Sequence, residues 1–576
     1  MNPAGAAALL HDAEPGRALD STTQARLTAL DLDWDEAAQR HRVRIPAQAN
    51  IAADTVGQHA HGPQADRTAL RFVDDTTGAV HELSFAELAD AAARLAVLLR
   101  ERAGVARGDV VAVHSGQRVE TVIAHLAAYR LGAIVATLSQ LYGADTVAHV
   151  LNDSGARVLV TQDTVWAPLR HLRLRCPALR TVIVAGAAQA DEVPFWQHRH
   201  CDPTASVPVA TRAEDPALLV YTSGSTGQPK GVLHAHRILH AYKPTLELFN
   251  NLELREPGLV FWTAADWAWV GGLNDIVFPS LQFGHCLVAT QRRYEPEWAL
   301  QFMQQHGVTH TLLTPTALNR LAQIHTPRTR WPQLKLRTIF TGGEPLPGAT
   351  LRWLHDELGV ACNEGYGMSE VNHMIGNCSK LRPLKPGSMG WQFPGHVAAL
   401  VDEAGQPVPD GEVGEIVTPA DTPTLFLGYW NQPALTTGMR LGPWIRTHDL
   451  AVRDADGYYW YRGRNDDLIK SAGYRIGPVE IEEVLMQHEA VAQAAVVGAP
   501  DAERTQIVVA FIVLRAHAGA GGEDLDGALR AHVRAHLGPY KVPRSWRYME
   551  QLPCTSTGKV SRAALRDLLQ ARTQPK

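Results

Sequence analysis

The sequence lacks several features that would assign it to a class at once. No uninterrupted apolar stretch reaches the roughly 20 residues that a transmembrane helix requires. The six cysteines, at positions 176, 201, 286, 362, 378 and 554, include no CxxC pair, so reduced thiols are expected rather than a disulfide framework. The formal net charge is only −5, which gives no large field of one sign for binding nucleic acid or an anionic membrane.

The N-terminus also lacks the marks of a secretory signal. Met1-Asn-Pro-Ala-Gly precedes a short Ala/Leu run without a basic region. At 576 residues the chain is too long for one hydrophobic core and should divide into at least two domains. We therefore expect a soluble cytoplasmic protein, and we assign no chemistry to residues 1–66.

The stretch from Tyr221 to Gly231, with the sequence YTSGSTGQPKG, is the most informative part of the chain. It follows the apolar run 217–220 and precedes residues 232–238, which are expected to enter a helix. Glycines free the backbone so that successive N–H groups can point at one anion, while hydroxyls and a lysine add further donors. The stretch predicts a polyphosphate site formed by Thr222, Ser223, Gly224, Ser225, Thr226, Gly227 and Lys230.

Two competing interpretations apply to this stretch. One is a surface loop that is rich in Gly and Ser without binding anything, since short motifs produce false matches. The other is the P-loop of kinases and NTPases, which requires four residues between two glycines and then Gly-Lys-Ser/Thr. Lys230 follows Pro229 and precedes Gly231, so the P-loop pattern fails.

The rest of the first 465 residues alternates predicted strands with predicted helices, which favours parallel sheets covered by helices. Ser84-Phe-Ala-Glu87 has the spacing of a capping box and is expected to open a helix that ends at Gly104. The expected strands are 69–73, 109–113, 133–137, 158–161, 308–313 and 336–340, and further helices are expected at about 34–42 and at 119–131. Beyond about residue 376, short strands and frequent turns predict a small β-rich subdomain.

The C-terminal part has the pattern of a separate small domain. We expect helices at 478–487 and 525–537, strands at 491–498 and 507–514, and an Ala/Gly linker at 516–522. The predicted organisation is a large α/β domain at 1–465 and a small mobile α+β domain at 466–576, a size typical of domains.

Several stretches, in order, resemble the adenylate-forming (AMP-binding) superfamily of acyl-CoA synthetases, luciferases and peptide-synthetase adenylation domains. The resemblance covers about residues 67–567, and the medium-chain acyl-CoA synthetase and acetyl-CoA synthetase group is most similar. It implies that the phosphate loop holds ATP, that TGGEPL (341–346) lies beside adenine, and that NEGYGMSE (363–370) stacks an aromatic ring on it. The residues that it places at the nucleotide are Gly343, Glu344, Pro345, Glu364, Gly365, Tyr366, Gly367, Met368 and Ser369.

The resemblance also implies roles for charged residues. Glu370 and Thr226 would hold the Mg²⁺ that ATP brings, which suits an ion that prefers oxygen ligands. Asp449 would accept hydrogen bonds from the ribose, although His448 stands where glycine is usual. Arg464 would bind ribose or phosphate.

The C-terminal residues would contribute catalysis and CoA binding. Asp466 would be the hinge, Arg475 would lie near the phosphates, and Lys559 in Thr557-Gly-Lys559 would be the catalytic lysine. CoA would contact Ala472, Gly473, Tyr474, Arg504, Arg534, Val542, Pro543 and Arg544. The implied reaction joins a carboxylic acid to AMP with release of pyrophosphate, and then passes the acyl group to CoA.

The acid itself is left open. Gly367 stands where acetyl-CoA synthetases have a tryptophan that closes the acyl pocket, so a deeper, medium-chain pocket is expected. Trp267 and Trp269 lie in the acyl-pocket segment and could refill that volume, in which case acetate or propionate would be preferred; packing in the core explains them equally well. The acceptor and the activity also have competing interpretations, namely an enzyme that loads a carrier-protein thiol and a non-catalytic nucleotide-binding protein.

Overall fold

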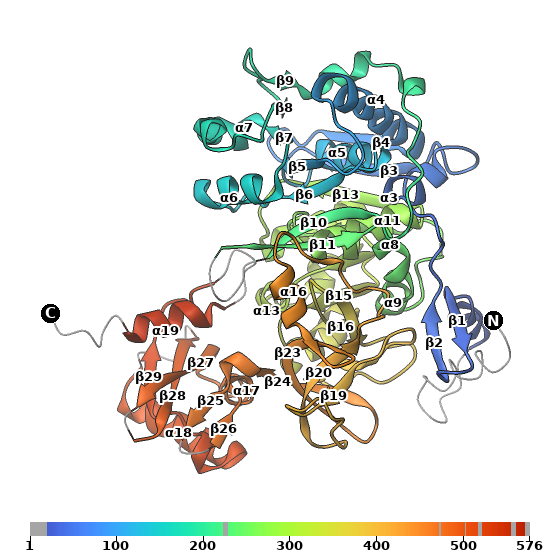
Figure 1. Ribbon diagram of the computed structural model, residues 1–576. Helices are drawn as coiled ribbons and strands as arrows, with labels where there is room; N and C mark the ends of the chain where they lie inside the picture. Colours follow the sequence, from blue (N-terminus) through green and yellow to red (C-terminus); the bar gives the residue numbers. More distant parts are fainter. Residues whose placement is uncertain are drawn as a thin grey trace. The chain divides into compact units, whose positions relative to one another are not determined.

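The computed structural model describes residues 20–222, 228–471, 474–501, 503–515, 521–554 and 560–570 (Figure 1). The chain forms two compact units. The first unit takes the chain up to Pro386 together with Gly390–Val397 and Ala420–Met439. The second takes Gly387–Met389, Ala398–Pro419 and the chain from Arg440. The predicted boundary at residue 465 separates a large domain from a mobile one. A division into compact units does not test mobility, so this boundary stays a prediction.

One sheet of the first unit is mainly parallel. Its strands in spatial order are β21 (Gly428–Tyr429), β11 (Lys230–Ala235), β10 (Pro216–Thr222), β6 (Ile134–Thr137), β5 (Val110–His114), β7 (Val158–Gln162), β8 (Thr181–Ala185) and β9 (Val193–Pro194). Every residue of β5, β6 and β7 is buried, as expected for parallel strands covered on both faces. The covering helices include α5 (Val119–Arg130) and α6 (Ala144–Ser154).

The helix α4 (Phe85–Ala103) begins and ends as its sequence predicts. The Ser84 side chain accepts from the Glu87 N–H, and the Glu87 side chain accepts from the Ser84 N–H, which completes the capping box. Gly104 ends the helix in the left-handed conformation, with φ of 64°.

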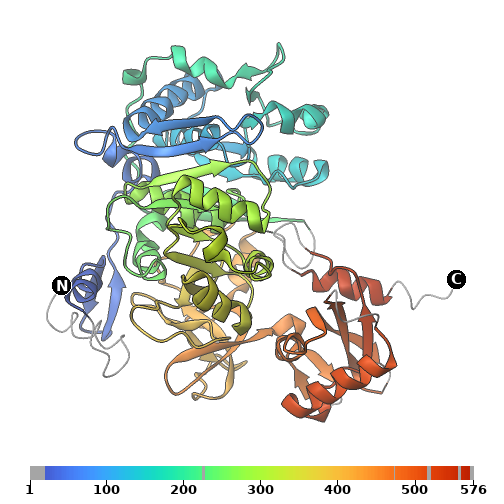
Figure 2. The same ribbon diagram turned by 180° about the vertical axis from the view of Figure 1, so that it is seen from behind.

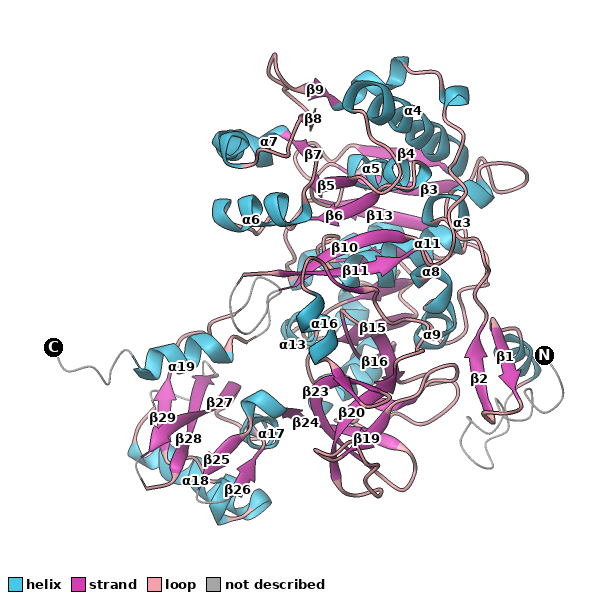
Figure 3. Ribbon diagram, viewed as in Figure 1, coloured by secondary structure: helices cyan, strands magenta, loops and turns pink. Residues whose placement is uncertain are grey.

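The second sheet of the first unit combines parallel strands with antiparallel edges. Its strands in spatial order are β18 (Gly390–Gln392), β17 (Asn372–Gly376), β16 (Ala361–Met368), β15 (Thr338–Gly342), β14 (His310–Leu312), β12 (Val260–Thr263), β13 (Cys286–Thr290), β3 (Thr68–Val73) and β4 (Val80–Ser84). The strands from β16 through β3 run parallel to one another. Figure 3 shows these strands with helices beside them.

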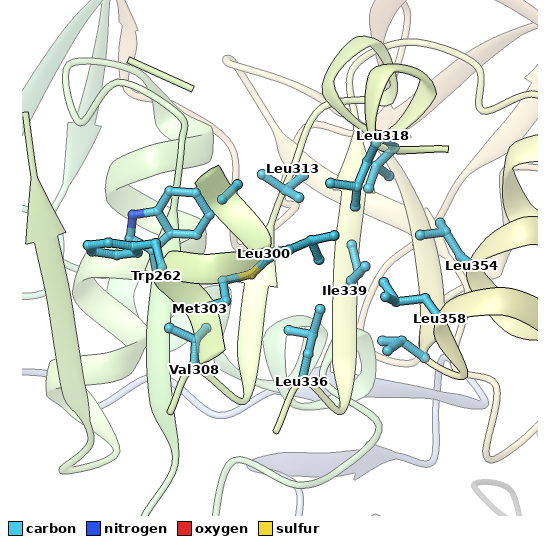
Figure 4. Packing of buried hydrophobic residues seen from close by; sticks show 14 of the residues in the cluster. Trp262, Leu300, Met303, Val308, Leu313, Leu318, Leu336, Ile339, Leu354 and Leu358 are labelled. Carbon is cyan, nitrogen blue, oxygen red and sulfur yellow. The ribbon is translucent and has the colours of Figure 1, made fainter. Parts of the chain in front are cut away.

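An apolar core packs helices against this sheet. Trp262 and Ile339 come from the strands, Leu300 and Met303 from α12 (Pro296–His306), and Leu354 from η6 (Leu354–Leu358) (Figure 4). Each of these side chains is almost completely buried, and burying one apolar side chain of this size contributes about 1.5–3 kcal/mol. The core therefore holds the ends of these strands in place, and the polar residues described below lie at those ends.

The other α- and π-helical segments described in the first unit are short connections around the two sheets. They are α2 (Ser21–Thr28), α3 (Ile51–Asp54), α7 (Asp163–Trp166), α8 (Ile238–Ala241), α9 (Lys243–Phe249), α10 (Val270–Gly272), η5 (Leu273–Val277), α11 (Phe278–Gln282), α13 (Pro315–Leu321), α14 (Pro327–Arg330), α15 (Gly348–Trp353) and α16 (Pro433–Gly438). The segment η5 is a π-helical turn, a feature that is frequent at functional sites.

The second unit contains an antiparallel sheet and a smaller α+β body. The first sheet has the order β19 (Ala399–Val401), β20 (Val413–Pro419), β23 (Trp444–Arg453) and β24 (Tyr458–Arg464), with β22 (Arg440–Leu441) beside β23. The other has the order β26 (Tyr474–Ile476), β25 (Ile469–Ser471), β28 (Thr505–Leu514) and β27 (Val491–Asp501), with β29 (Ser545–Tyr548) beside β28. Its helices are α17 (Pro478–Met486), α18 (Glu523–Leu537) and α19 (Arg562–Gln570).

Most of the predicted elements are confirmed, and two are wrong. Residues 34–42 do not form a helix: they belong to a hairpin of β1 (Leu32–Asp35) and β2 (Arg40–Val43). The Asp35 side chain accepts from the N–H groups of Ala37 and Ala38 and so stabilises a turn, and Gln39 closes it with φ of 47°. Residues 230–235 form β11, so the phosphate loop connects two antiparallel strands, and the helix expected over 232–238 begins only at Ile238, in α8 (Ile238–Ala241).

The structure also describes the cysteines and the longer helices of the chain. All six cysteines have free thiols, three of them buried. Within the part of the chain that the structure describes, no helix combines the length and the apolar character that crossing a membrane requires. The N-terminal 19 residues and the Ala/Gly stretch at 516–520 lie outside that part.

Candidate active site

The strands that flank the phosphate loop are well anchored. In the antiparallel pair β10–β11, Thr222 lies opposite Lys230 and Tyr221 opposite Gly231. The Tyr221 hydroxyl donates to Asp153 Oδ2 at 2.6 Å. The predicted loop residues Ser223, Gly224, Ser225, Thr226 and Gly227 lie outside the described residues, so the structure fixes the two ends from which the loop departs.

Gly231 is a glycine because of packing rather than backbone freedom. Its φ is not positive, and it lies inside β11. A Cβ there would lie 2.9 Å from Leu219 Cδ1 and 3.0 Å from Trp430 Cβ. The role expected for this glycine, curling of the loop, is therefore corrected: it lets two neighbouring segments approach β11.

Lys230 and Glu370 are connected by a residue that the sequence reasoning missed. Tyr429, on β21, donates a hydrogen bond from its hydroxyl to Glu370 Oε1 at 2.5 Å. The Lys230 ammonium lies 5.8 Å from the centre of the Tyr429 ring, within the range of a cation–π contact. Glu370 is only 8% exposed, so its carboxylate has a fixed position. The signal that could have found Tyr429 is the Gly-Tyr-Trp stretch at 428–430.

The turn that holds Glu370 is tied to both sheets of the first unit. It follows β16, and His234 Nε2 on β11 lies 2.7 Å from the Ser369 carbonyl oxygen. The Phe426 N–H donates to the Glu370 carbonyl oxygen at 2.8 Å. Asn372 completes the turn with φ of 55°, a conformation that asparagine tolerates. Ser369 and Glu370 therefore lie where the phosphate-loop strands meet the end of β16.

The residues expected beside adenine are at the ends of two adjacent parallel strands. Gly343, with φ of 86°, follows β15, and Glu344 Oε2 accepts a hydrogen bond from Thr316 Oγ1 at 2.8 Å. On β16, Glu364 Oε1 accepts from the Leu346 N–H at 3.3 Å, which holds the loop containing Pro345 against the strand. The carboxyl ends of parallel strands are where ligands gather in open α/β sheets.

Gly365, Tyr366, Gly367 and Met368 continue along β16. Tyr366 is 9% exposed, while Gly367 and Met368 are partly exposed. A Cβ on Gly367 would lie 2.1 Å from the Asn372 carbonyl oxygen, because the β16–β17 register shifts between Tyr366 and Gly367. Gly367 is therefore required by the backbone of the neighbouring strand, and no side chain can extend from it into a pocket without moving that strand.

The two candidate tryptophans of the acyl segment differ in their surroundings. Trp267 is 1% exposed and faces a small apolar void of about 10 Å³ with Val122 and Leu126 of α5 and Phe278 of α11. Trp269 is partly exposed, and its ring lies 5.8 Å from that of Tyr142, edge to face. Trp267 thus has the environment of a core residue, and Trp269 that of a residue near the surface.

A buried acid–histidine pair lies close to these elements and was not anticipated. Asp275, on the π-helical turn η5, is 2% exposed, and its Oδ2 lies 3.3 Å from His373 Nε2. The His373 ring stacks on Tyr242 at 5.7 Å and meets Phe249 and Phe340 edge to face at 5.3 and 5.1 Å. His373 Nδ1 and Asp275 Oδ1 have no hydrogen-bond partner among the described residues.

This pair lies near the end of β15. A Cβ on Gly342 would be 3.5 Å from His373 Cε1, so the histidine ring lies beside the last residue of that strand. His373 is also opposite Gly367 in the β16–β17 pair. The pair therefore lies beside two residues, Gly342 and Gly367, of the strands that carry the predicted site.

The second unit places Asp449 and Arg464 side by side. They are opposite residues on β23 and β24, and Asp449 Oδ1 accepts a hydrogen bond from the Tyr461 hydroxyl at 3.1 Å. Burial and the neighbouring Asp449 raise the pKa of Tyr461 well above its usual value, so it stays a donor. His448 has φ of 63°, and its N–H donates to Glu415 Oε1 at 3.0 Å. This left-handed conformation explains why glycine would suit position 448.

The residues expected to bind CoA lie on several elements of the same unit. Tyr474, on β26, is 54% exposed and stacks on Tyr540 at 4.7 Å, just before Val542, Pro543 and Arg544. Arg504 lies in the turn between β27 and β28, and Arg534 on the exposed side of α18. Asp466 and Arg475 belong to the described backbone of η7 (Asn465–Asp467) and β26. Ala472, Gly473 and Lys559 lie outside the described residues.

Comparison with known proteins identifies the family to which the chain belongs. The family model of the AMP-binding enzyme matches residues 57–430, and that of the AMP-binding enzyme C-terminal domain matches residues 480–559. The chain belongs to the AMP-binding enzyme family. It is an AMP-forming acid–thiol ligase, with ATP, a carboxylic acid and CoA as substrates.

Curated relatives cover most of the chain. The acetyl-coenzyme A synthetase of Pyrobaculum aerophilum is 32% identical over 526 residues, which cover 84% of this chain and 77% of the relative. The human mitochondrial acyl-coenzyme A synthetase ACSM4 is 32% identical over 563 residues and 96% of both chains. The 4-hydroxybenzoate–CoA/benzoate–CoA ligase of Rhodopseudomonas palustris is 32% identical over 525 residues, which cover 90% of this chain and 94% of the relative.

Solved structures support the same fold. That of the anthranilate CoA ligase AuaEII in complex with anthranoyl-AMP has a TM-score of 0.81 and 28% identity, covering 92% of this chain and 98% of that one. That of a benzoate CoA ligase from Burkholderia xenovorans has a TM-score of 0.77 and 28% identity, covering 90% of this chain and 99% of that one. The predicted α/β fold, the family and the enzyme class are thus confirmed.

Proposed function

We propose that this enzyme makes acyl-CoA from a carboxylic acid larger than acetate, and that Glu370, Lys230 and Tyr429 form the phosphate-binding part of its active site. The observation that carries the proposal is the connection of Glu370 to Tyr429 and Lys230 beside the ends of β10 and β16. The core environment of Trp267 supports an acyl pocket larger than acetate needs, because a tryptophan packed in the core does not fill that pocket. A cytoplasmic location, in agreement with the free thiols, is part of this proposal.

The first half-reaction joins the acid to AMP. One carboxylate oxygen attacks the α-phosphorus of ATP, the bond to the β-phosphate oxygen breaks, and pyrophosphate leaves with its electron pair. Negative charge grows on phosphate oxygens, so fixed donors and cations in a dry site lower the barrier. Lys230 supplies a positive charge at the end of β11, and Lys559 is proposed to offset the repulsion between the carboxylate and the α-phosphate.

The residues present also fit the magnesium ion that would accompany ATP. The described residues contain no group of three or more His, Cys, Asp or Glu that could enclose a metal by themselves. Mg²⁺ is usually held by one or two carboxylates and substrate phosphates, so the single buried carboxylate of Glu370, with Thr226, suits it. When bound, Mg²⁺ would neutralise phosphate charge. Tyr429 would keep the Glu370 carboxylate oriented through its hydrogen bond.

The second half-reaction transfers the acyl group to CoA. The CoA sulfur attacks the acyl carbon of acyl-AMP, the C–O bond to AMP breaks, and AMP leaves with its electron pair. In this proposal Asp449 and Arg464 hold the ribose, Arg475 contacts a phosphate, and the exposed Tyr474 and Val542–Arg544 contact CoA. Loading of a carrier-protein thiol stays the alternative, and CoA-dependent release of AMP distinguishes it.

A second candidate substrate class is an aromatic acid with a polar substituent. The Asp275–His373 pair favours it, because unpartnered polar atoms surrounded by the rings of Tyr242, Phe249 and Phe340 suit a planar ring with a hydrogen-bonding group. The relatives described as anthranilate and 4-hydroxybenzoate/benzoate CoA ligases are consistent with this candidate.

A panel of acids tests the proposal and separates the two candidates. If the pocket takes alkyl chains, kcat/KM should rise roughly fourfold for each methylene from acetate upward, since each buried methylene adds about 0.8 kcal/mol, until the pocket ends. If it takes substituted aromatic acids, anthranilate or 4-hydroxybenzoate should exceed every alkyl acid. An optimum at acetate would contradict both, and absence of CoA-dependent AMP release with any acid would contradict the proposed function.

Because Gly271 lies beside Asp275 and has room for a Cβ, we choose it rather than Gly367 for narrowing the proposed pocket. A Cβ on Gly271, in α10, would lie 3.8 Å from Asp275 Oδ2 and 3.9 Å from Leu312 Cδ1, in ordinary contact. We expect Gly271→Val to lower kcat/KM for the preferred acid by roughly tenfold while changing that for acetate less than about threefold. Gly438→Val, at a helical glycine with nothing within 4 Å, is the control. A uniform loss across all acids would contradict the placement of Gly271 at the pocket.

The hinge is tested by fixing the backbone at Asp466. Asp466→Pro would hold φ near about −65° and restrict rotation in η7. We expect thioester formation from pre-made acyl-AMP to fall more than acyl-AMP formation does. Asp466→Ala, which keeps the backbone free, is the control. Wild-type rates for both half-reactions in Asp466→Pro would place the pivot at another residue.

A further inference from the structure

A separate hollow of about 370 Å³ lies in the first unit, and none of the predicted site residues lines it. One wall is Arg40–Val43 of β2 with Ile45, and the opposite wall is Ala420–Pro423. Gly395, Val397, Glu214 and Arg237 complete it. The family match begins at residue 57, so the hairpin wall lies outside the matched stretch. Figures 1 and 2 show this hairpin apart from the strands that follow it in the sequence.

The walls are held in place by tight packing. Gly395 has φ of 88°, and a Cβ there would lie 2.8 Å from Val43 Cγ2 and 3.0 Å from Leu32 Cδ2, so the hairpin packs directly on this turn. Arg237 is only 11% exposed and donates to the carbonyl oxygen of Pro423 at 2.9 Å and to that of Leu425. The hollow therefore has fixed sides.

Three guanidinium groups line the hollow, and two of them share one carboxylate. Arg40, Arg42 and Arg237 line it together with Glu214 and Asp421. Arg237 pairs with Glu214. Arg40 and Arg42, two residues apart on β2, both reach the same oxygen of Asp421, at 3.4 and 3.5 Å. These distances exceed the 2.7–2.9 Å or so of a good charge-assisted hydrogen bond, so Asp421 binds both guanidinium groups only weakly. Arg42 also donates to Asp35 through its Nε, whereas the atom near Asp421 is its Nη1.

A phosphate group would bind Arg40 and Arg42 more strongly than Asp421 does. It presents three oxygens and up to two negative charges, whereas Asp421 offers one shared oxygen and one charge. The volume is larger than a bare phosphate ion requires, so the ligand has a further part. His41, which also lines the hollow, is 7% exposed, and burial lowers its pKa, so it is neutral at pH 7 and can accept as well as donate a hydrogen bond.

We propose that this hollow binds a small phosphate monoester, whose phosphate oxygens displace Asp421 and bind Arg40 and Arg42. This site is distinct from the ATP and CoA sites and does not depend on the identity of the acid. Its wall continues along the chain to Phe426 and Tyr429, which bond to the main chain and the side chain of Glu370. A ligand here thus binds at the start of the segment that positions the phosphate-binding carboxylate.

Calorimetric titration with glycerol 3-phosphate tests the proposal. The enzyme is first saturated with an acyl-sulfamoyl adenosine, which occupies the acyl-AMP position, and inorganic phosphate and citrate are titrated in parallel. We expect saturable binding of glycerol 3-phosphate that weakens roughly tenfold or more in R40Q/R42Q, the scale of losing charged hydrogen bonds. D421N should bind it more tightly, because the competing carboxylate is gone. R44Q, which follows the same strand but is paired with Asp33 outside the hollow, should behave as wild type.

Any different outcome overturns part or all of the proposal. No saturable binding, or equal binding by wild type and R40Q/R42Q, excludes the hollow as the site. Equal losses in R44Q and R40Q/R42Q indicate a general basic surface. Citrate binding as tightly as glycerol 3-phosphate overturns the preference for phosphate, and inorganic phosphate binding as tightly overturns the need for a monoester. The gain in D421N keeps the test decisive even if R40Q/R42Q fails to fold, which thermal melting would reveal.

Discussion

Replacing Glu370 by glutamine is expected to slow acyl-AMP formation by about two orders of magnitude, the scale of losing one oriented electrostatic group. Glutamine keeps the shape and can still accept from Tyr429, but it removes the negative charge that a magnesium ion requires. Because glutamine has the size of glutamate and the turn is held through main-chain atoms by Phe426 and His234, the variant should fold normally. The rate of pyrophosphate exchange at increasing Mg²⁺ concentrations measures the effect.

Two further variants make this result specific. Tyr429→Phe removes only the hydroxyl that orients Glu370, so a smaller loss of roughly tenfold is expected, with full activity approached at high Mg²⁺. Glu357→Gln, at an exposed acid on η6, should leave every rate unchanged. If Glu370→Gln exchanges pyrophosphate at the wild-type rate, Glu370 has no part in holding the metal or the phosphates.

Lys559→Ala is expected to reduce acyl-AMP formation by roughly two orders of magnitude or more, while pre-made acyl-AMP is still consumed with CoA. The physical reason is that two anions, the carboxylate and the α-phosphate, must approach in the first half-reaction only. Separate assays of pyrophosphate release and of thioester formation from synthetic acyl-AMP measure the two steps. Lys335→Ala, at an exposed lysine of the first unit, is the control. Equal losses in both steps would contradict the assignment of Lys559 to adenylation.

Local signals in the sequence predicted the local structure well. The capping box at Ser84, the left-handed Gly104 and the buried strands around residues 110 and 158 all appear as expected. Each depends on residues within a few positions of one another, so the sequence contains the whole cause. The order of motifs also sufficed to identify the family, because several separate stretches had to match at once.

The errors arose where distant segments decide the conformation. Residues 230–235 form a strand because β10 and β21 pair with them on both sides. No local pattern in the sequence predicts that pairing. Gly367 was interpreted as an opening in the acyl pocket, whereas the backbone at Asn372 leaves no room for any side chain. The sequence did not predict the Tyr429–Glu370 contact or the Asp275–His373 pair, because the two residues of each lie far apart in the sequence.

The antiparallel connection of β10 to β11 has an electrostatic consequence for ATP binding. A phosphate loop that leads into a helix gains the helix dipole, equivalent to roughly half a positive charge that no substitution of a side chain removes. Here the strand β11 follows the loop, and strands have only small net dipoles. The permanent positive charge at the first residue of β11 is therefore the charge of one side chain, Lys230. Acetylation of the Lys230 amine would remove that charge. ATP affinity in this enzyme should accordingly respond to ionic strength and to lysine acylation more steeply than in proteins whose phosphate loop ends in a helix.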